Sequence, residues 1–164
     1  MAVLEAFGLH MLHLHPNAVL VLATFAHACE AFVGIMPSMA LFRHFFMPRR
    51  GRSRWIAGGV SFCLKQKNAR QYPETKIHPS WEEWRKNWYF AQAGSLSPHI
   101  LVPTAPAESL ANSKDVSSQD EALWPIIRKF AELRDSQVTG AMVAGDFVRR
   151  RIAPLQHRDR KSVV

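Results

Sequence analysis

The sequence predicts a mainly α-helical fold with a minor short β element, which places the chain in the α+β class. Residues 17–33 form a long apolar segment with helix start and stop signals. Residues 123–133 repeat apolar side chains at helical spacing, whereas residues 59–65 alternate as a strand does. A hydrophobic content of 48%, with ten Phe and five Trp, is enough for a sizeable core and argues against full-length disorder.

The first helix is predicted over residues 17–33. Pro16 and Asn17 are a helix-start signal, because the Asn side chain can accept hydrogen bonds from the free amides of the first turn. The segment is apolar nearly all round, which indicates burial on several sides. Gly34 is a stop signal, since glycine readily adopts the left-handed conformation that ends many helices.

A second helix is predicted over residues 37–47, from Pro37 to the residue before Pro48. With the first helix it makes a helical hairpin at the N-terminus. Residues 49–54 are expected to form a basic loop, and residues 59–65 a short strand. The strand places three apolar side chains on one face, namely Val60, Phe62 and Leu64.

The middle of the chain is polar and turn-prone over residues 68–79. Trp81, Trp84 and Trp88 then follow at helical spacing, which puts three indoles on one face. Such a stripe can stack the bases of a single-stranded nucleic acid, but we favour a core role because Trp buries a large apolar area. Residues 99–102 are expected to form another short strand.

Two C-terminal helices are predicted. The first begins near Pro125, a residue suited to a first helical turn, and breaks at residues 135–137. Thr139 can cap the second, which should run to about Ile152 and stop at Pro154. The apolar stripe of the first of these helices consists of Leu123, Ile126, Ile127, Phe130 and Leu133.

Composition divides the chain into four parts. Residues 1–102 are interpreted as the N-terminal part of one domain, and residues 121–155 as the C-terminal helical pair of the same domain. Between them, residues 103–120 are rich in Pro and Ser and read as a linker. Residues 156–164 are expected to be a disordered basic tail.

Basic residues exceed acidic ones by 21 to 13, giving a net charge of +8 that attracts polyanions non-specifically. Two arginine clusters are candidates for contact with nucleic-acid phosphates. For each we favour solvated surface over phosphate contact, because charge runs are commonly just that, and the first could also serve as a nuclear-import patch. The clusters are Arg49, Arg50, Arg52 and Arg54, and Arg149, Arg150 and Arg151.

His27 and Glu30 stand three residues apart on the first helix, where they could act as an acid–base pair. We favour a buried polar pair that satisfies itself and fixes the packing of the helix. A second histidine group, at His10, His13 and His15, superficially suggests a metal site. It has no Cys or acidic partner nearby in sequence, so no metal is expected there.

Several classes of function find no motif in the chain. There is no Gly-rich phosphate loop, no nucleophile elbow, no zinc knuckle, no D-[ST]-G and no Y-x-D-D. We therefore expect no catalytic residues and no cofactor. Cys29 and Cys63 suggest a reduced intracellular compartment. The apolar run from residue 18 to 33 is short for a membrane span and contains a carboxylate, which favours a core helix.

Two blocks of sequence carry a family resemblance. The first contains LHPNAVL, A-x-ACEAFVGI and ALFRHFF between residues 13 and 48. The second contains WEEWR at residues 81–85, and LRD and DFVRRRIAPL between residues 133 and 156. Together they resemble the gypsy-type transposon (transposase-like) domain of plants. The resemblance implies a retrotransposon-derived origin, but it supplies no reaction or ligand. Because similar proteins usually begin further upstream, it also implies a truncated copy.

The sequence thus favours a non-enzymatic, intracellular protein with an interaction or assembly role. Its partners would be other retroelement-derived proteins or nucleic acid, with no membrane and no small-molecule substrate. A non-specific nucleic-acid-binding module is the first alternative, with nuclear localisation suggested by the basic patches. A fragment without function is the second.

Overall fold

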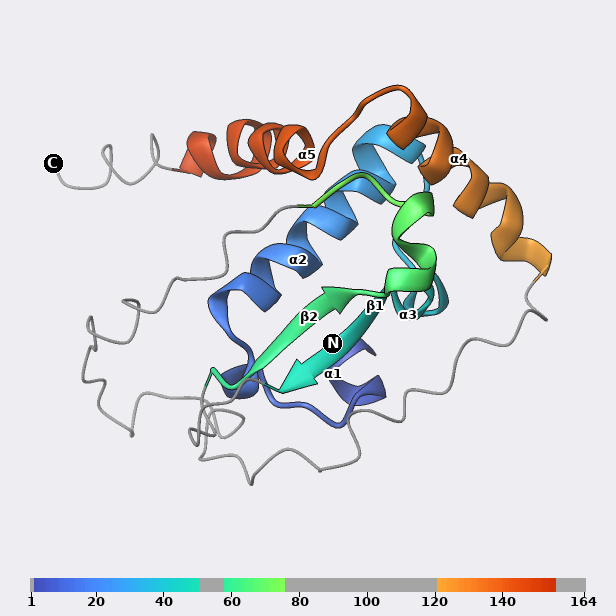
Figure 1. The fold of residues 1–164 in the computed structure, drawn as a ribbon. Coiled ribbons are helices and arrows are strands. Elements are labelled where there is room, and N and C mark those ends of the chain that lie inside the picture. Colours follow the sequence, from blue (N-terminus) through green and yellow to red (C-terminus); the bar gives the residue numbers. More distant parts are fainter. Residues whose placement is uncertain (1, 51–57, 76–120, 156–164) are drawn as a thin grey trace, which may run out of the picture.

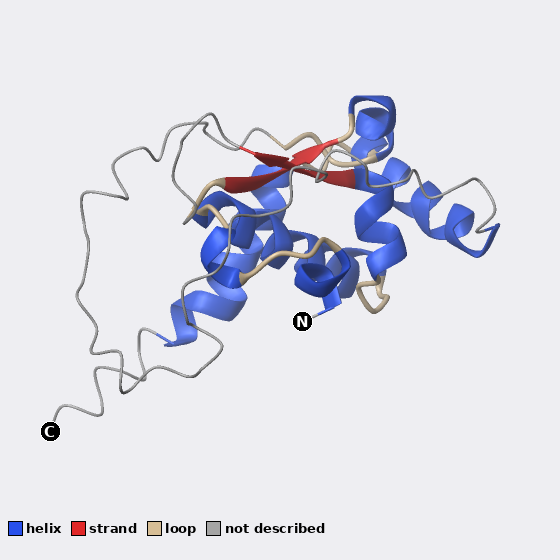
Figure 2. Ribbon diagram, turned by 90° about the horizontal axis from the view of Figure 1, so that it is seen from below, coloured by secondary structure: helices blue, strands red, loops and turns tan. Residues whose placement is uncertain are grey.

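The computed structural model describes residues 2–50, 58–75 and 121–155 (Figure 1). Most of these residues are helical, and a two-stranded antiparallel sheet is the β element. The predicted fold class is therefore confirmed. The elements are α1 (Ala2–Ala6), α2 (Pro16–His27), α3 (Met39–Phe45), β1 (Phe46–Arg50), β2 (Val60–Leu64), α4 (Trp124–Asp135) and α5 (Gly140–Phe147). Short 3-10 turns cover Met11–His13, Gln66–Gln71 and Glu121–Leu123. Most of the helices lie on one face of the sheet (Figure 2).

Helix α2 begins one residue earlier than predicted, and a histidine caps it. The ring Nδ1 of His15 accepts the amide hydrogen of Asn17 at 3.1 Å, and Pro16 occupies the first turn. Asn17 is therefore inside the helix rather than its cap, because the preceding imidazole already satisfies the first free amide. The helix continues as a π-helical segment, Ala28–Val33, and ends at Gly34 with φ 75°. Gly34 confirms the predicted stop.

Helix α3 is shorter than the predicted 37–47. The hydroxyl of Ser38 accepts the amide hydrogen of Leu41 at 3.2 Å, and the helix ends at Phe45. Strand β1 follows at once, so Pro48, Arg49 and Arg50 lie in a strand instead of at a helix end and in a loop. The helix ends here because pairing with β2 buries Phe46 and Pro48, whereas a continued helix would not bury these two side chains.

The register of the sheet points the backbone of Pro48 away from β2. Residue pairs run from Phe46 opposite Leu64 to Arg50 opposite Val60. The amide of Lys65 donates to the carbonyl of Phe45, so these two residues form a hydrogen-bonded pair. Along an antiparallel ladder such pairs alternate with pairs that make no hydrogen bond to one another, and Pro48 belongs to a pair of the second kind. Pro48, which has no amide hydrogen, therefore faces the free edge of β1. The other edge of β2 forms a parallel bridge between Val60 and Leu14.

An aromatic cluster makes up the centre of the core, and the C-terminal helices complete it. Phe130 of α4 is fully buried, stacks on Tyr72 at a centroid distance of 5.3 Å, and lies 5.2 Å from Phe45. The same ring lies 6.5 Å from Phe25 of α2. Edge-to-face and stacked ring pairs of this kind are stabilising beyond the area that they bury. The N-terminal helices and α4 therefore share one core.

The first C-terminal helix agrees closely with the prediction. Pro125 lies in its first turn. Ile127 and Phe130 of the predicted stripe are buried, and its other three members pack against the core. The helix ends in a Schellman motif, in which the amides of Gln137 and Val138 donate to the carbonyls of Arg134 and Leu133.

The second C-terminal helix starts as predicted but runs past its predicted stop. The hydroxyl of Thr139 caps α5 by accepting the amide hydrogen of Met142 at 3.2 Å. A π-helical segment, Val148–Ile152, extends α5, and helical residues continue to Leu155. Pro154 therefore does not end the helix. The wider π turn accommodates the proline ring, which would clash with the carbonyl four residues earlier in a regular α-helix.

Several predictions lie outside the described residues. They concern the three tryptophans, the strand over 99–102, the linker over 103–120, the tail over 156–164, and the arginines at positions 52 and 54. The division into four parts stays a prediction.

Candidate functional site

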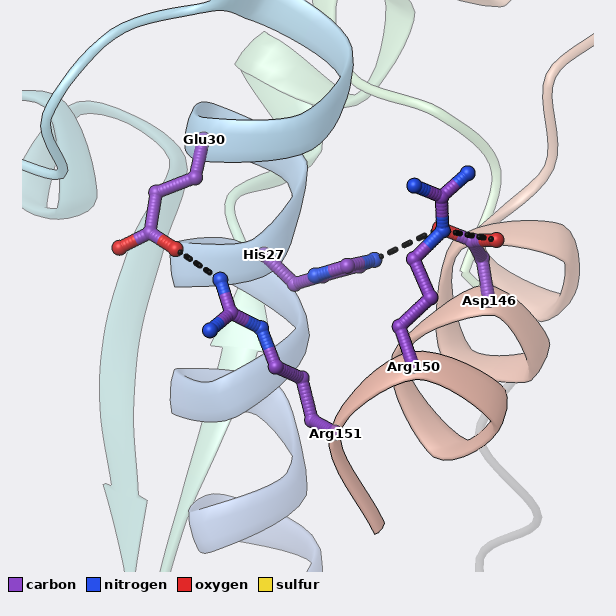
Figure 3. Close-up of polar contacts among 5 residues, drawn as sticks. All are labelled: His27, Glu30, Asp146, Arg150 and Arg151. Carbon is purple, nitrogen blue, oxygen red and sulfur yellow. Dashed lines mark hydrogen bonds and ion pairs between the residues drawn. The ribbon is translucent and has the colours of Figure 1, made fainter. Parts of the chain in front are cut away.

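The most specific polar arrangement of the described residues joins α2 to α5 (Figure 3). The ring Nε2 of His27 lies 2.9 Å from Oδ2 of Asp146, and the Nη2 of Arg151 lies 2.9 Å from Oε2 of Glu30. The Nε of Arg150 is 3.0 Å from each carboxylate oxygen of Asp146. We call these five residues the polar clasp. It joins positions that are more than a hundred residues apart in sequence.

Both sides of the clasp stand where an α-helix changes into a π-helix. The π segment of the first helix begins directly after His27 and contains Glu30. The π segment of the second contains Arg150 and Arg151, and begins two residues after Asp146. A π turn holds more residues per turn than an α turn and therefore changes which side chains face the neighbouring helix. The local winding thus sets the position of the clasp residues.

Asp146 is held as a carboxylate. Its pKa is lowered mainly by the hydrogen bond from His27, and further by the hydrogen bond and positive charge of Arg150. A carboxylate only accepts hydrogen bonds, so the proton between the two side chains belongs to Nε2 of His27, which donates it.

The histidine ring sits in an apolar environment. Its centroid lies 6.0 Å from that of Phe32 and 5.8 Å from that of Phe147. The side chain of His27 is only 3% exposed, and its Nδ1 has no hydrogen-bond partner among the described residues. Because Nε2 is used by Asp146 and Nδ1 is enclosed, neither nitrogen is open to a substrate from solvent.

The predicted pair of His27 with Glu30 is wrong. Both residues bind partners on the C-terminal helix rather than one another, and the Glu30 side chain is 39% exposed. Sequence reasoning missed Asp146, the partner that His27 does have. A usable signal was its spacing of four residues from Arg150, which favours an ion pair on a helix, in a segment with a single acid (GAMVAGDFVRRRIAPL).

The N-terminal histidines serve as backbone caps. Nδ1 of His10 accepts from the amide of Leu12 at 3.2 Å, and the amide of His10 donates to Nδ1 of His13 at 3.0 Å. His15 caps α2 in the same way. No group of three or more His, Cys, Asp or Glu with metal-site geometry occurs within residues 2–50, 58–75 and 121–155.

The arginine clusters predicted to touch phosphate differ in what they offer. Arg49 and Arg50 are exposed at the end of β1. Arg149 is exposed and has no ion-pair partner in the described part of the chain, whereas Arg150 and Arg151 are paired within the clasp. Figure 1 shows the end of β1 and the C-terminal part of α5 well apart, so the described arginines do not form one continuous surface. Arg52 and Arg54 lie outside the described residues.

A second feature that the sequence did not reveal is an exposed apolar stripe on the extension of α5. Val148, Ile152 and Leu155 are 47%, 38% and 52% exposed. Val148 and Ile152 belong to the π segment and Leu155 to the turn after it, so the three side chains stand about one turn apart and on the same side of the helix. We call these three residues the apolar stripe. Their spacing was visible in the sequence, but it is equally typical of a buried helix face, so exposure could not be inferred.

The cysteines offer no reactive thiolate in the core. Cys29 is fully buried, and burial together with the negative charge of Glu30 raises the pKa of its thiol to about 12. Cys63 is half-buried on β2. Burial also raises the pKa of the Tyr72 hydroxyl above its ordinary range. Both Cys29 and Tyr72 are therefore neutral core residues at physiological pH.

The helix formed by Pro16–Val33 is long and apolar enough to cross a membrane by length and composition alone. Core helices of soluble proteins pass the same test. Here the helix contributes to the aromatic core through Phe25, and to the clasp through His27 and Glu30.

Residues 1–50 match the family model described as "Putative gypsy type transposon". This match confirms the resemblance drawn from the N-terminal block, whereas the second block lies outside the matched residues. No curated protein and no solved structure matches the chain. The matched segment supplies His27 and Glu30 of the clasp, and the remainder of the chain supplies Asp146, Arg150 and Arg151.

Proposed function

We propose, on the premise that residues 1–50 carry the gypsy-type transposon segment, that this chain is a retroelement-derived, non-enzymatic protein that binds another protein. The observation that carries the proposal is the apolar stripe. The clasp and buried Val143 hold α5 against α2, yet Val148, Ile152 and Leu155 remain exposed on the same helix. Apolar side chains gathered on one exposed face are typical of a surface that a partner covers.

The chemistry of the buried polar groups supports a non-enzymatic role. His27 is enclosed and hydrogen-bonded to Asp146, and the thiol of Cys29 is protonated at neutral pH. A general base or a nucleophile has to reach its substrate in the reactive protonation state.

The family name also contains the word transposon, so nuclease activity has to be tested directly. We expect no cleavage of supercoiled plasmid by the purified chain with Mg²⁺ or Mn²⁺.

The binding role can be tested by chemical cross-linking of the full chain in nuclear and cytoplasmic extracts, followed by mass spectrometry. We expect a protein that cross-links to the wild type and not to the Ile152→Asp variant, because the new charge makes burial of the stripe unfavourable. Met36→Asp is the matched control, since Met36 is 79% exposed and lies outside the stripe. Equal cross-linking of all three proteins, or metal-dependent plasmid cleavage, would contradict the proposal.

Non-specific nucleic-acid binding is a second candidate, favoured by the exposed Arg49 and Arg50 and by Arg149, which is exposed and has no ion-pair partner among the described residues. It predicts affinity for duplex DNA that falls steeply with salt. Replacing Arg149 by Ala should lower the slope of log affinity against log salt by about 1. Replacing Arg151 should change it less, because Glu30 already neutralises that charge. If no binding is measurable at low salt, this candidate fails.

We also propose that the protein acts inside the cell, where its basic segments would suit nuclear import. A fragment without function is the competing explanation, and it predicts that the chain expressed alone shows no cooperative melt by circular dichroism. A cooperative melt would support a folded domain that retains a role.

A further inference from the structure

We infer that the apolar stripe binds an acidic amphipathic helix of a partner protein, with Arg149 as the residue that faces its carboxylates. This inference rests on the proposed protein-binding function and names the chemistry of the partner. Its starting point is the spacing of Val148, Ile152 and Leu155, which is the pattern of anchors that a helix uses when it packs against a second helix or a groove.

Charge decides which kind of helix fits. The clasp neutralises Arg150 with Asp146 and Arg151 with Glu30. Arg149 remains exposed beside the stripe, with no ion-pair partner among the described residues. Arg149 therefore leaves one uncompensated positive charge beside the stripe, in a chain whose net charge is +8. A helix with Glu or Asp beside its apolar face complements this surface.

The other possible occupants fit less well. A symmetric pair of chains joined through the stripe would bring two uncompensated Arg149 charges into one contact and supply no acidic partner for either, which is unfavourable. Membrane-surface helices commonly insert Trp, Phe or Leu. The stripe contains Leu155 but no aromatic residue, and each member is partly covered by its own fold. The phosphate backbone of a nucleic acid would leave the apolar side chains without a partner to bury them.

The test uses synthetic probes and the full chain. Two fluorescent amphipathic peptides of about 18 residues share one apolar face, and carry Glu in one peptide and Lys in the other beside it. We expect the Glu peptide to bind at least about tenfold more tightly than the Lys peptide, by fluorescence anisotropy. Arg149→Glu should reverse this preference, and Ile152→Asp should abolish binding. Met36→Asp, at an exposed position outside the stripe, should bind as the wild type does.

Anionic vesicles, duplex DNA and analytical ultracentrifugation test the other occupants. Tighter binding to vesicles of phosphatidylserine and phosphatidylcholine, or to DNA, would overturn the inference. Self-association that Ile152→Asp removes would also overturn it, as would equal or absent binding of both peptides. If a protein cross-links to the stripe but Arg149→Glu does not weaken its binding, the protein-binding function stands. Only the inference that the partner helix is acidic is then wrong.

Discussion

Gly140 marks a close approach between α5 and residues Glu74 and Thr75. Its amide donates to the carbonyl of Glu74 at 2.9 Å. A Cβ at this position would lie 2.8 Å from Oγ1 and 3.0 Å from Cα of Thr75, and 3.1 Å from the Glu74 carbonyl oxygen. Two of these three atoms belong to the backbone, which cannot move aside easily. The position therefore requires glycine for space.

This close approach predicts opposite effects at two glycines of one helix. Gly140→Ala should lower the free energy of unfolding by about 1–3 kcal/mol through overpacking. Gly145 has open space around its Cα, so Gly145→Ala should raise the free energy of unfolding by up to about 1 kcal/mol through helix propensity. Urea denaturation of both variants measures the two values. A stabilising Gly140→Ala would show that α5 does not pack against Thr75 as described.

The Asp146 carboxylate predicts a dependence of stability on pH. Its pKa in the folded chain lies below the ordinary value because of His27 and Arg150. A lowered pKa contributes stability that is fully present above the unfolded pKa, about 4, and is lost as the pH falls through the folded pKa.

Denaturation of the wild type and of Asp146→Asn between pH 7 and pH 3 tests this dependence. Below about pH 5 the difference in unfolding free energy between them should shrink as the pH falls. A difference that is independent of pH would mean that the carboxylate is not held ionised by its partners.

Among the elements, the turn between α4 and α5 has a residue that is not suited to its conformation. Gln137 has φ 62°, at the position of the Schellman motif that glycine usually occupies. A residue with a side chain costs about 1–2 kcal/mol in the left-handed region. Glycine would recover only part of this cost, because an unfolded glycine has more conformational freedom to lose on folding.

Gln137→Gly should therefore raise the free energy of unfolding by about 0.5–1 kcal/mol. Ser136→Gly is the control, because Ser136 has φ −77° and gains nothing from glycine. Thermal and urea denaturation compare the two variants. An equal effect at both positions would argue against the left-handed turn.

Sequence patterns predicted those elements whose signals are local. The helix over 17–33 and the stripe of α4 follow from apolar spacing and from the stop at Gly34, each visible within a few turns. Strand β1 was not predicted, because FMPRR contains a proline and two arginines. The segment forms a strand by pairing with Val60–Leu64. The clasp escaped prediction because 119 positions separate His27 from Asp146, and no local pattern specifies such a contact.

At the scale of the whole molecule, the two ends of the chain depend on one another. The segment that matches the transposon family contributes Phe25 and Phe45 to the core, while Tyr72 and Phe130 come from outside it. The family segment alone would expose these aromatic faces to water. We therefore expect that residues 1–50 do not fold as a separate unit.

Removing the C-terminal helices tests this dependence. A chain that ends at residue 120 loses Ile127, Phe130 and Val143 from the core. It also loses Asp146 and Arg151, to which His27 and Glu30 are hydrogen-bonded. It should lose the cooperative thermal transition and the near-ultraviolet circular dichroism of the intact protein. A chain that ends at residue 155 keeps every described core residue and should melt as the full chain does. An unchanged melt of the shorter chain would show that the N-terminal part is self-sufficient.

The outward orientation of Pro48 has a consequence for how the protein behaves when concentrated. The edge of β1 that faces away from β2 is a place where the described sheet could recruit a strand from a second molecule. Growth of that kind needs an uninterrupted row of amide hydrogens, and Pro48 removes the central one. Arg49 and Arg50 beside it add mutual repulsion between molecules. The sheet is thereby protected from templating fibrils, and a Pro48→Val variant should be the more prone to them.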